Sequence, residues 1–157
     1  VLDLTTGCGA IAVIAGLQGA SGIAVDINPQ AVRNAAENFQ RFRVPMIAIH
    51  GDLFSNVPAG KYDLIVANGP YLEAEGEITD PLEYSFYGAR RYIEALFRGA
   101  PPHLKTNGRM LITFAEWGEM RFFEDTARAA GFAFRVLAKR TSDDGQRIYR
   151  FYELRLN

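Results

Sequence analysis

The chain of 157 residues is 48% hydrophobic and 22% charged, which is enough to bury one sizeable core, and we expect a single domain over 1–157. Its net charge of −1 excludes a global electrostatic footprint for nucleic acid or for a membrane surface. One cysteine, two distant histidines and no 18-residue apolar run exclude an internal disulfide, indicate no metal site and no membrane partner, and favour a cytoplasmic protein.

The first half of the chain alternates strand-like and helical segments. It begins abruptly in a strand, without the lead-in that would cover a central strand, so we expect that an upstream N-terminal segment is missing. Asn28 is a good N-cap and Pro29 a good first helical residue, and apolar side chains then recur at spacings of three and four up to Phe42. The predicted elements are a strand over 1–4, a helix over 10–17, a strand over 22–25, a helix from Pro29 and a strand over 46–49.

The second half ends in a predicted hairpin, whose polar turn contains Asp144-Gly145. A long irregular segment over 72–88 carries five acidic side chains. Such loops are often functional lids, although a plain solvated loop fits as well. The predicted elements are a strand over 62–66, a helix over 89–99, a strand over 109–114, a helix over 119–130 and strands over 132–140 and 147–156.

This alternation predicts the fold class. Right-handed crossovers return each strand to the same edge, which gives a parallel sheet with helices on both faces. We therefore expect an α/β fold, a Rossmann-like three-layer sandwich whose mostly parallel seven-stranded sheet carries an antiparallel C-terminal hairpin strand.

Three markers of a nucleotide-type cofactor follow successive strands. Gly7-Cys8-Gly9 lies between a strand and a helix, where bare backbone lets a ligand approach closely, although a merely structural turn has the same pattern. Asp26 is placed to accept hydrogen bonds from both ribose hydroxyls, and its charge disfavours a 2′-phosphate. Asp52 is placed to accept from an adenine amino group while Leu53 or Ile27 packs on the ring; a turn-capping aspartate is the alternative.

A fourth signal, Asn68-Gly69-Pro70-Tyr71, follows the buried strand at 62–66, at the edge where open α/β sheets bind ligands. A planar amide or aromatic amine has a delocalised nitrogen lone pair, so an enzyme must orient the NH₂ by accepting its protons. Asn68 Oδ1 and the Gly69 carbonyl can each accept one N–H, and Tyr71 can stack on the planar group. Transfer of a group to that nitrogen would then depend on proximity and electrostatic placement rather than on acid/base catalysis.

Together these motifs resemble those of the class I S-adenosylmethionine-dependent methyltransferases, in the small-domain group of release-factor glutamine methyltransferases and amino-directed nucleic-acid methyltransferases. The resemblance rests on the segments 1–10, 25–29, 51–54, 68–71 and 104–109. It implies S-adenosylmethionine as the cofactor and an N-methyltransferase activity. By this resemblance the cofactor-binding residues are Asp3, Thr5, Gly7, Gly9, Asp26, Ile27, Asp52, Leu53 and Asn68, and the catalytic residues are Asn68, Gly69, Pro70 and Tyr71.

The methyl acceptor is expected to be a macromolecule. The resemblance around Asp80-Pro81-Leu82-Glu83 and Arg90-Arg91-Tyr92 favours a protein glutamine, as in a release factor, and acidic residues after Tyr71 would repel phosphate. A base amine of RNA or DNA is the alternative, because basic residues concentrate on the final hairpin; more often such a run is a solvated face.

Two departures from the family pattern keep other functions open. Thr5 stands where the first glycine is usual, and Gly69 replaces the first proline of the substrate motif, so a non-catalytic cofactor-binding domain is an alternative. An NAD-dependent oxidoreductase would also use the glycine turn and Asp26, but it leaves Asp52 unexplained. Trp117 is interpreted as a core anchor, in preference to a neighbour of the substrate loop.

Overall fold

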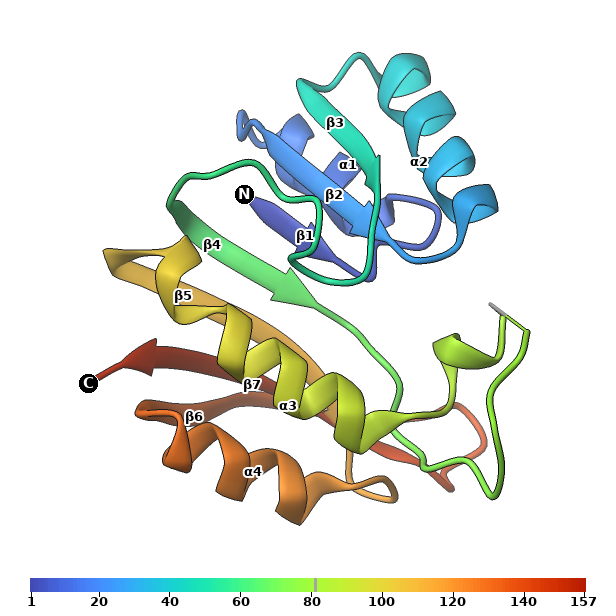
Figure 1. Cartoon of the computed structure of the whole chain (residues 1–157), viewed down its shortest axis with the longest axis vertical. Helices are drawn as coiled ribbons and strands as arrows, with labels where there is room; N and C mark the ends of the chain where they lie inside the picture. Colours follow the sequence, from blue (N-terminus) through green and yellow to red (C-terminus); the bar gives the residue numbers. More distant parts are fainter. Residues whose placement is uncertain (81) are drawn as a thin grey trace.

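The computed structural model describes residues 1–80 and 82–157 (Figure 1). Pro81, which belongs to one of the segments that favour a glutamine acceptor, lies outside these described residues. The strands are β1 Leu2–Leu4, β2 Gly22–Asp26, β3 Met46–His50, β4 Tyr62–Ala67, β5 Leu104–Ala115, β6 Phe132–Thr141 and β7 Ile148–Leu156. The helices are α1 Ala10–Leu17, α2 Pro29–Phe42, α3 Ala89–Gly99 and α4 Met120–Ala129, with 3₁₀ turns η1 Glu83–Ser85 and η2 Pro101–His103.

The strands form one seven-stranded sheet in the order β3-β2-β1-β4-β5-β7-β6. Strands β1 to β5 pair in parallel, and β7 pairs antiparallel with both β5 and β6. The expected fold class is therefore confirmed. Because the strand order reverses between β1 and β4, the carboxyl ends of these two strands flank a crevice, which is where this kind of sheet binds ligands.

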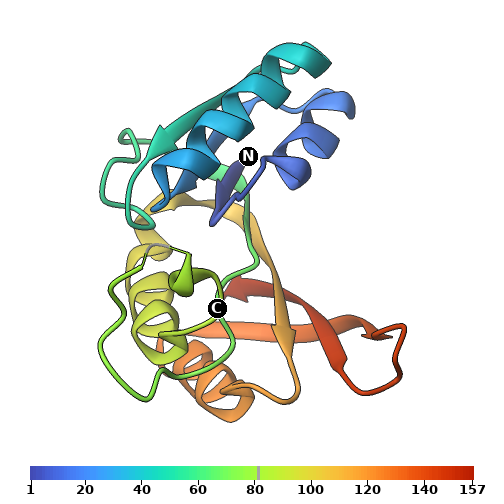
Figure 2. The same ribbon diagram turned by 90° about the vertical axis from the view of Figure 1, so that its right-hand side faces the viewer.

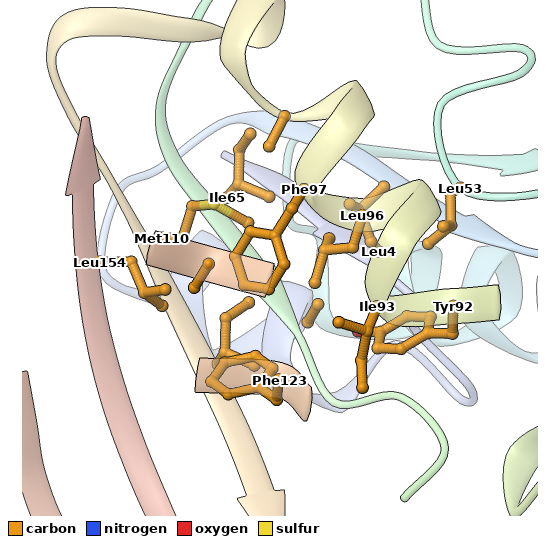
Figure 3. Packing of buried hydrophobic residues seen from close by; sticks show 14 of the residues in the cluster. Leu4, Leu53, Ile65, Tyr92, Ile93, Leu96, Phe97, Met110, Phe123 and Leu154 are labelled. Carbon is orange, nitrogen blue, oxygen red and sulfur yellow. The ribbon is translucent and has the colours of Figure 1, made fainter. Parts of the chain in front are cut away.

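Two hydrophobic cores cover opposite faces of the sheet. One joins α1 and α2 to β2 and β3, around Phe39 and Met46. The larger one joins α3 and α4 to the central strands, around Phe97 and Phe123 (Figure 3). Successive residues of a strand point to opposite faces, so Leu2 and Leu4 enter the larger core while Asp3 between them faces the glycine turn.

Local signals explain most element boundaries. The Asn28 side chain accepts a hydrogen bond from the Gln30 N–H (2.9 Å) and caps α2, and Arg43 ends this helix in the left-handed conformation.

In Figure 2 the turn between β6 and β7 lies on the far side of the molecule from α3. None of the helices in the described part of the chain is both long and apolar enough to cross a membrane.

One strand differs from the prediction. The sequence places the start of β5 at Arg109, but the strand begins at Leu104. Tyr62 pairs with Leu104 while Leu64 pairs with Arg109, so the intervening residues form an irregularity inside the strand instead of a turn before it. Gly108 fits there because a Cβ would lie 2.9 Å from the Tyr62 carbonyl oxygen.

Candidate functional site

The turn after β1 is organised around the buried carboxylate of Asp3, which is 1% exposed. Its Oδ2 accepts hydrogen bonds from the Thr6 hydroxyl (2.6 Å) and the Ala12 N–H (3.2 Å). Its Oδ1 is buried without a hydrogen-bond partner among the described residues. Burial raises the pKa of Asp3 from its ordinary 3.8 to about 6, against the opposing effect of these two donors. Asp3 therefore offers an unused acceptor and a negative charge beneath the turn.

The two glycines of the turn have different tasks. Gly7 has φ 57° and open space where a Cβ would stand, so its backbone is bare toward a ligand. Gly9 has φ 81° and caps α1, and a Cβ there would lie 2.7 Å from Cε1 of Phe39. Gly9 thus lets α1 and α2 pack closely, while Gly7 keeps the crevice open.

Asp26 at the end of β2 connects this turn to the next one. Its Oδ2 accepts from the Gly7 N–H (2.8 Å) and its Oδ1 from the Asn28 N–H (2.9 Å). Each carboxylate oxygen can accept more than one hydrogen bond, so the carboxylate is held in place and retains capacity for a diol. Ile27, whose carbonyl contacts the His50 ring nitrogen (2.9 Å), follows directly.

Two adjoining cavities lie along the carboxyl ends of the strands. Thr5, Asp26, Ile27, Pro70 and Tyr84 line both of them. The first continues past Gly51, Asp52 and Leu53 toward Arg91 and Tyr92, and the second continues past Gly7 toward Asn68 and Gly69. The structure thus brings most of the predicted site residues to one crevice. Of the predicted site residues, Asp3, Gly9 and Tyr71 line neither cavity.

Asp52 is not free in the first cavity. Its Oδ2 pairs with the Arg91 guanidinium at 2.5 Å, and the two side chains are 43% and 64% exposed. Such an exposed pair contributes little to stability, so Asp52 can exchange partners at small cost. Leu53 is buried beside it, with φ 49°.

Asn68 is exposed at the end of β4, and two contacts fix its position. Its N–H donates to the Thr5 hydroxyl (3.3 Å), and its Oδ1 accepts from the Tyr71 hydroxyl. In this arrangement Oδ1 faces the phenol and Nδ2 faces away from it. Burial raises the pKa of Tyr71, so the phenol stays protonated and acts as a donor.

Tyr71 is surrounded by aromatic rings. Its ring centre lies 5.3 Å from that of Phe114, 5.9 Å from Trp117 and 6.0 Å from Tyr149. The interpretation of Trp117 as a core anchor is wrong, because this side chain is 40% exposed and packs beside Tyr71. Trp117 lies in the loop after β5, which the parallel sheet brings to the same edge as β4.

The comparisons with known proteins agree with this arrangement. The family model of the methyltransferase small domain matches residues 1–124. The chain belongs to this family.

Relatives of this methyltransferase small domain act on more than one kind of acceptor. It is 36% identical over 148 residues to a release factor glutamine methyltransferase of Cereibacter sphaeroides, covering 85% of this chain and 52% of that protein. It is 32% identical over 142 residues to ribosomal RNA small subunit methyltransferase C of Chromohalobacter salexigens, covering 87% of this chain and 39% of that protein. The chain thus spans about half the length of these relatives or less.

A solved structure shows the same fold. A 16S rRNA methyltransferase of T. thermophilus, in complex with AdoMet and guanosine, matches with a TM-score of 0.68 and 18% identity, covering 99% of this chain and 37% of that one. The resemblance to class I methyltransferases expected from the sequence is confirmed.

Sequence reasoning missed several residues of the methyltransferase crevice. Tyr84 lines both cavities from η1, inside the segment predicted to be irregular, and the Arg91 guanidinium lies 5.9 Å from its ring centre. Gly118 packs against the substrate motif, since a Cβ there would lie 2.3 Å from the Tyr71 carbonyl oxygen. The sequence offered one usable signal, the Trp117-Gly118 pair directly after a parallel strand. It had none for the Arg91–Asp52 pair, which joins residues 39 apart.

Proposed function

We propose that this domain is an S-adenosylmethionine-dependent N-methyltransferase that acts on the side-chain amide of a protein glutamine. The observation that carries this proposal is the exposed Asn68 side chain at the end of β4, whose Oδ1 accepts from the Tyr71 hydroxyl while the backbone N–H of the same residue donates to the Thr5 hydroxyl. An oriented carbonyl oxygen can accept a proton of a planar NH₂ group and so set the direction of its lone pair.

The hydrogen-bond acceptors along the crevice suit S-adenosylmethionine. Asp3 presents a buried oxygen that has no hydrogen-bond partner in the described part of the chain, beneath the Gly7 turn, and such an acceptor suits a cationic amino-acid tail. In this proposal Asp26 would accept from the ribose hydroxyls and Asp52 from the adenine amino group, since both line the crevice. When bound, S-adenosylmethionine would supply an electrophilic methyl group on its sulfonium. The residues of the chain would bind it, orient the acceptor nitrogen and exclude water from the crevice.

A second acceptor class, a base amine of RNA or DNA, is favoured by one observation. Trp117 stacks edge-on to Tyr71 and Tyr149, and the Arg147 guanidinium lies 5.5 Å from its ring centre. Exposed aromatic rings with a cation beside them suit an unstacked base near a phosphate. The relatives of both kinds are consistent with either acceptor.

The test is transfer of labelled methyl from S-adenosylmethionine into a methyl-deficient cell extract, divided between protease and nuclease digestion. Loss of label with protease alone supports the glutamine acceptor, and loss with nuclease alone supports the nucleic acid. Asn68→Ala should abolish transfer while cofactor binding persists. Asn34→Ala, which removes an exposed amide on α2 away from the crevice, is the matched control and should retain transfer. Absence of transfer by the wild-type chain would contradict the proposal.

A further inference from the structure

The two residues that depart from the family pattern, Thr5 and Gly69, both lie against Tyr92 of α3. The Thr5 side chain and the Gly69 backbone are polar groups beside the Tyr92 hydroxyl. The two departures are 64 residues apart in the sequence, and only the fold brings them to the same side chain. Both departures also adjoin Asn68, because Gly69 follows it directly and the Thr5 hydroxyl accepts its backbone N–H.

The Tyr92 ring occupies the space that a side chain at position 69 would need. A Cβ built on Gly69 would lie 2.1 Å from Tyr92 Cζ and 2.5 Å from each Cε, far inside any tolerated contact. The backbone of Gly69 is outside the left-handed region, so glycine is required here for space and not for conformation. The Gly69 N–H donates no hydrogen bond among the described residues, so the amide is not the reason either.

The ring of Tyr92 is packed against the larger core on one side and lines the first cavity on the other. Tyr92 is 7% exposed and packs in the larger core with Leu4 and Leu53, as Figure 3 shows. Its hydroxyl is fully buried and has no partner of hydrogen-bonding geometry within the described structure. On its core side the ring is close-packed, so a side chain at position 69 would push it toward the first cavity, which Tyr92 also lines.

Thr5 completes the arrangement. Its φ of 59° lies in the left-handed region, which a β-branched residue rarely adopts and which suits the glycine usual at this position. The hydroxyl compensates, because it donates to the Leu4 carbonyl and accepts the Asn68 N–H at 3.3 Å. A strained residue held by its own side chain is typical of functional sites.

We infer that Thr5, Gly69 and Tyr92 form one compensated unit that positions Asn68, and that Tyr92 is a positioning residue for methyl transfer. The inference rests on the proposed function for its kinetic part. The ring of Tyr92 replaces the rigidity that proline would give position 69. The Thr5 hydroxyl fixes the preceding residue by accepting the backbone N–H of Asn68. Neither departure is therefore a sign of lost activity, and restoring either family residue alone should be harmful.

The experiment combines substitutions at positions 69 and 92. Gly69→Ala and Gly69→Pro should each lower the melting temperature and lower kcat by about ten- to a hundredfold, because the turn is pushed off the ring. Adding Tyr92→Leu removes the Cε and Cζ atoms of the ring, and should restore most of the lost melting temperature and most of the lost kcat. Adding Tyr92→Phe instead keeps those ring carbons and should restore neither, which makes it the matched control. Equal recovery in both double variants, or wild-type behaviour of Gly69→Pro, would overturn the inference.

Two further measurements separate positioning from simple destabilisation. Thr5→Gly should lower kcat while the melting temperature and the Kd for S-adenosylmethionine stay close to wild type, and Thr5→Ser should recover kcat because it keeps the hydroxyl. A parallel fall of kcat and melting temperature in Thr5→Gly would contradict the positioning role. If the wild-type chain transfers no methyl, the proposed function fails. Non-additive melting temperatures at 69 and 92 would then still support the unit, and additive ones would refute it.

Discussion

Asp3 should make the stability of this domain fall as the pH rises, which is the opposite of the usual behaviour of an aspartate. Its pKa is raised from 3.8 to about 6 because its carboxylate is buried. Between these values the folded state keeps a proton that the unfolded state has released, so stability is lost as the pH rises and the loss is complete above pH 6. A shift of about two units corresponds to about 3 kcal/mol, of which about 2 kcal/mol falls between pH 4.5 and 7.

The variant that reveals this effect is Asp3→Asn. The amide oxygen can still accept from the Thr6 hydroxyl and the Ala12 N–H, but the side chain no longer titrates. We expect the stability of Asp3→Asn relative to wild type to increase by about 2 kcal/mol from pH 4.5 to 7, or roughly 6 °C in melting temperature for a chain of this size. Taking the difference between the two proteins removes the contribution of other carboxylates, such as Glu153, whose pKa is lowered by Arg135.

The assay is urea unfolding of both proteins at several pH values without ligand. A difference in unfolding free energy that stays constant from pH 4.5 to 7 would refute the assignment of a buried, protonated Asp3. A difference of the opposite sign would mean that the carboxylate is stabilised as an anion, by a donor to Oδ1 absent from the contacts described above. Added S-adenosylmethionine should reduce the pH dependence of the wild type, since a cationic ligand favours ionised Asp3.

Three other predictions concern the turns around the crevice. Asp26→Ala should weaken binding of S-adenosylmethionine by at least about tenfold in calorimetry, because it releases the Gly7 and Asn28 N–H groups as well as the ribose site; unchanged affinity would exclude Asp26 from the site. Tyr71→Phe removes the donor to Asn68 Oδ1 but keeps the ring, so kcat should fall by about tenfold with cofactor affinity unchanged, and an equal loss of affinity would argue for a general disturbance. Gly118→Ala should cost about 1 to 3 kcal/mol of unfolding free energy, since its Cβ meets the Tyr71 carbonyl; wild-type stability would show that the loop after β5 yields easily.

Much of the site could be predicted because it depends on strand ends. In a parallel sheet the carboxyl ends of β1, β2, β3 and β4 meet along one edge, so residues that follow each strand become neighbours without any knowledge of side-chain contacts. Asp26, Asp52 and Asn68 were placed by this rule. The helix boundary at Asn28 depends on local capping, which the sequence also displays.

The remainder depends on side chains that meet from distant segments. Arg91 lies in the first turn of α3, and no neighbouring residue in the sequence indicates that its partner is Asp52. Tyr84 reaches the crevice from a segment without periodicity. Gly69 is a departure from its motif in the sequence, and its reason, the Tyr92 ring in the space of a Cβ, is visible only in the fold. The extension of β5 before Arg109 is also invisible locally, because it depends on pairing with Tyr62.

The position of Trp117 gives the molecule an optical property. It is the only tryptophan of the chain, it is 40% exposed, and its ring packs against those of Tyr71 and Tyr149, of which Tyr71 is hydrogen-bonded to Asn68. Its intrinsic fluorescence therefore reports on that side of the crevice without any added dye. Acceptor fragments, whether glutamine peptides or short oligonucleotides, can be titrated against the unmodified domain and ranked by the change in emission before a single methyl group is transferred.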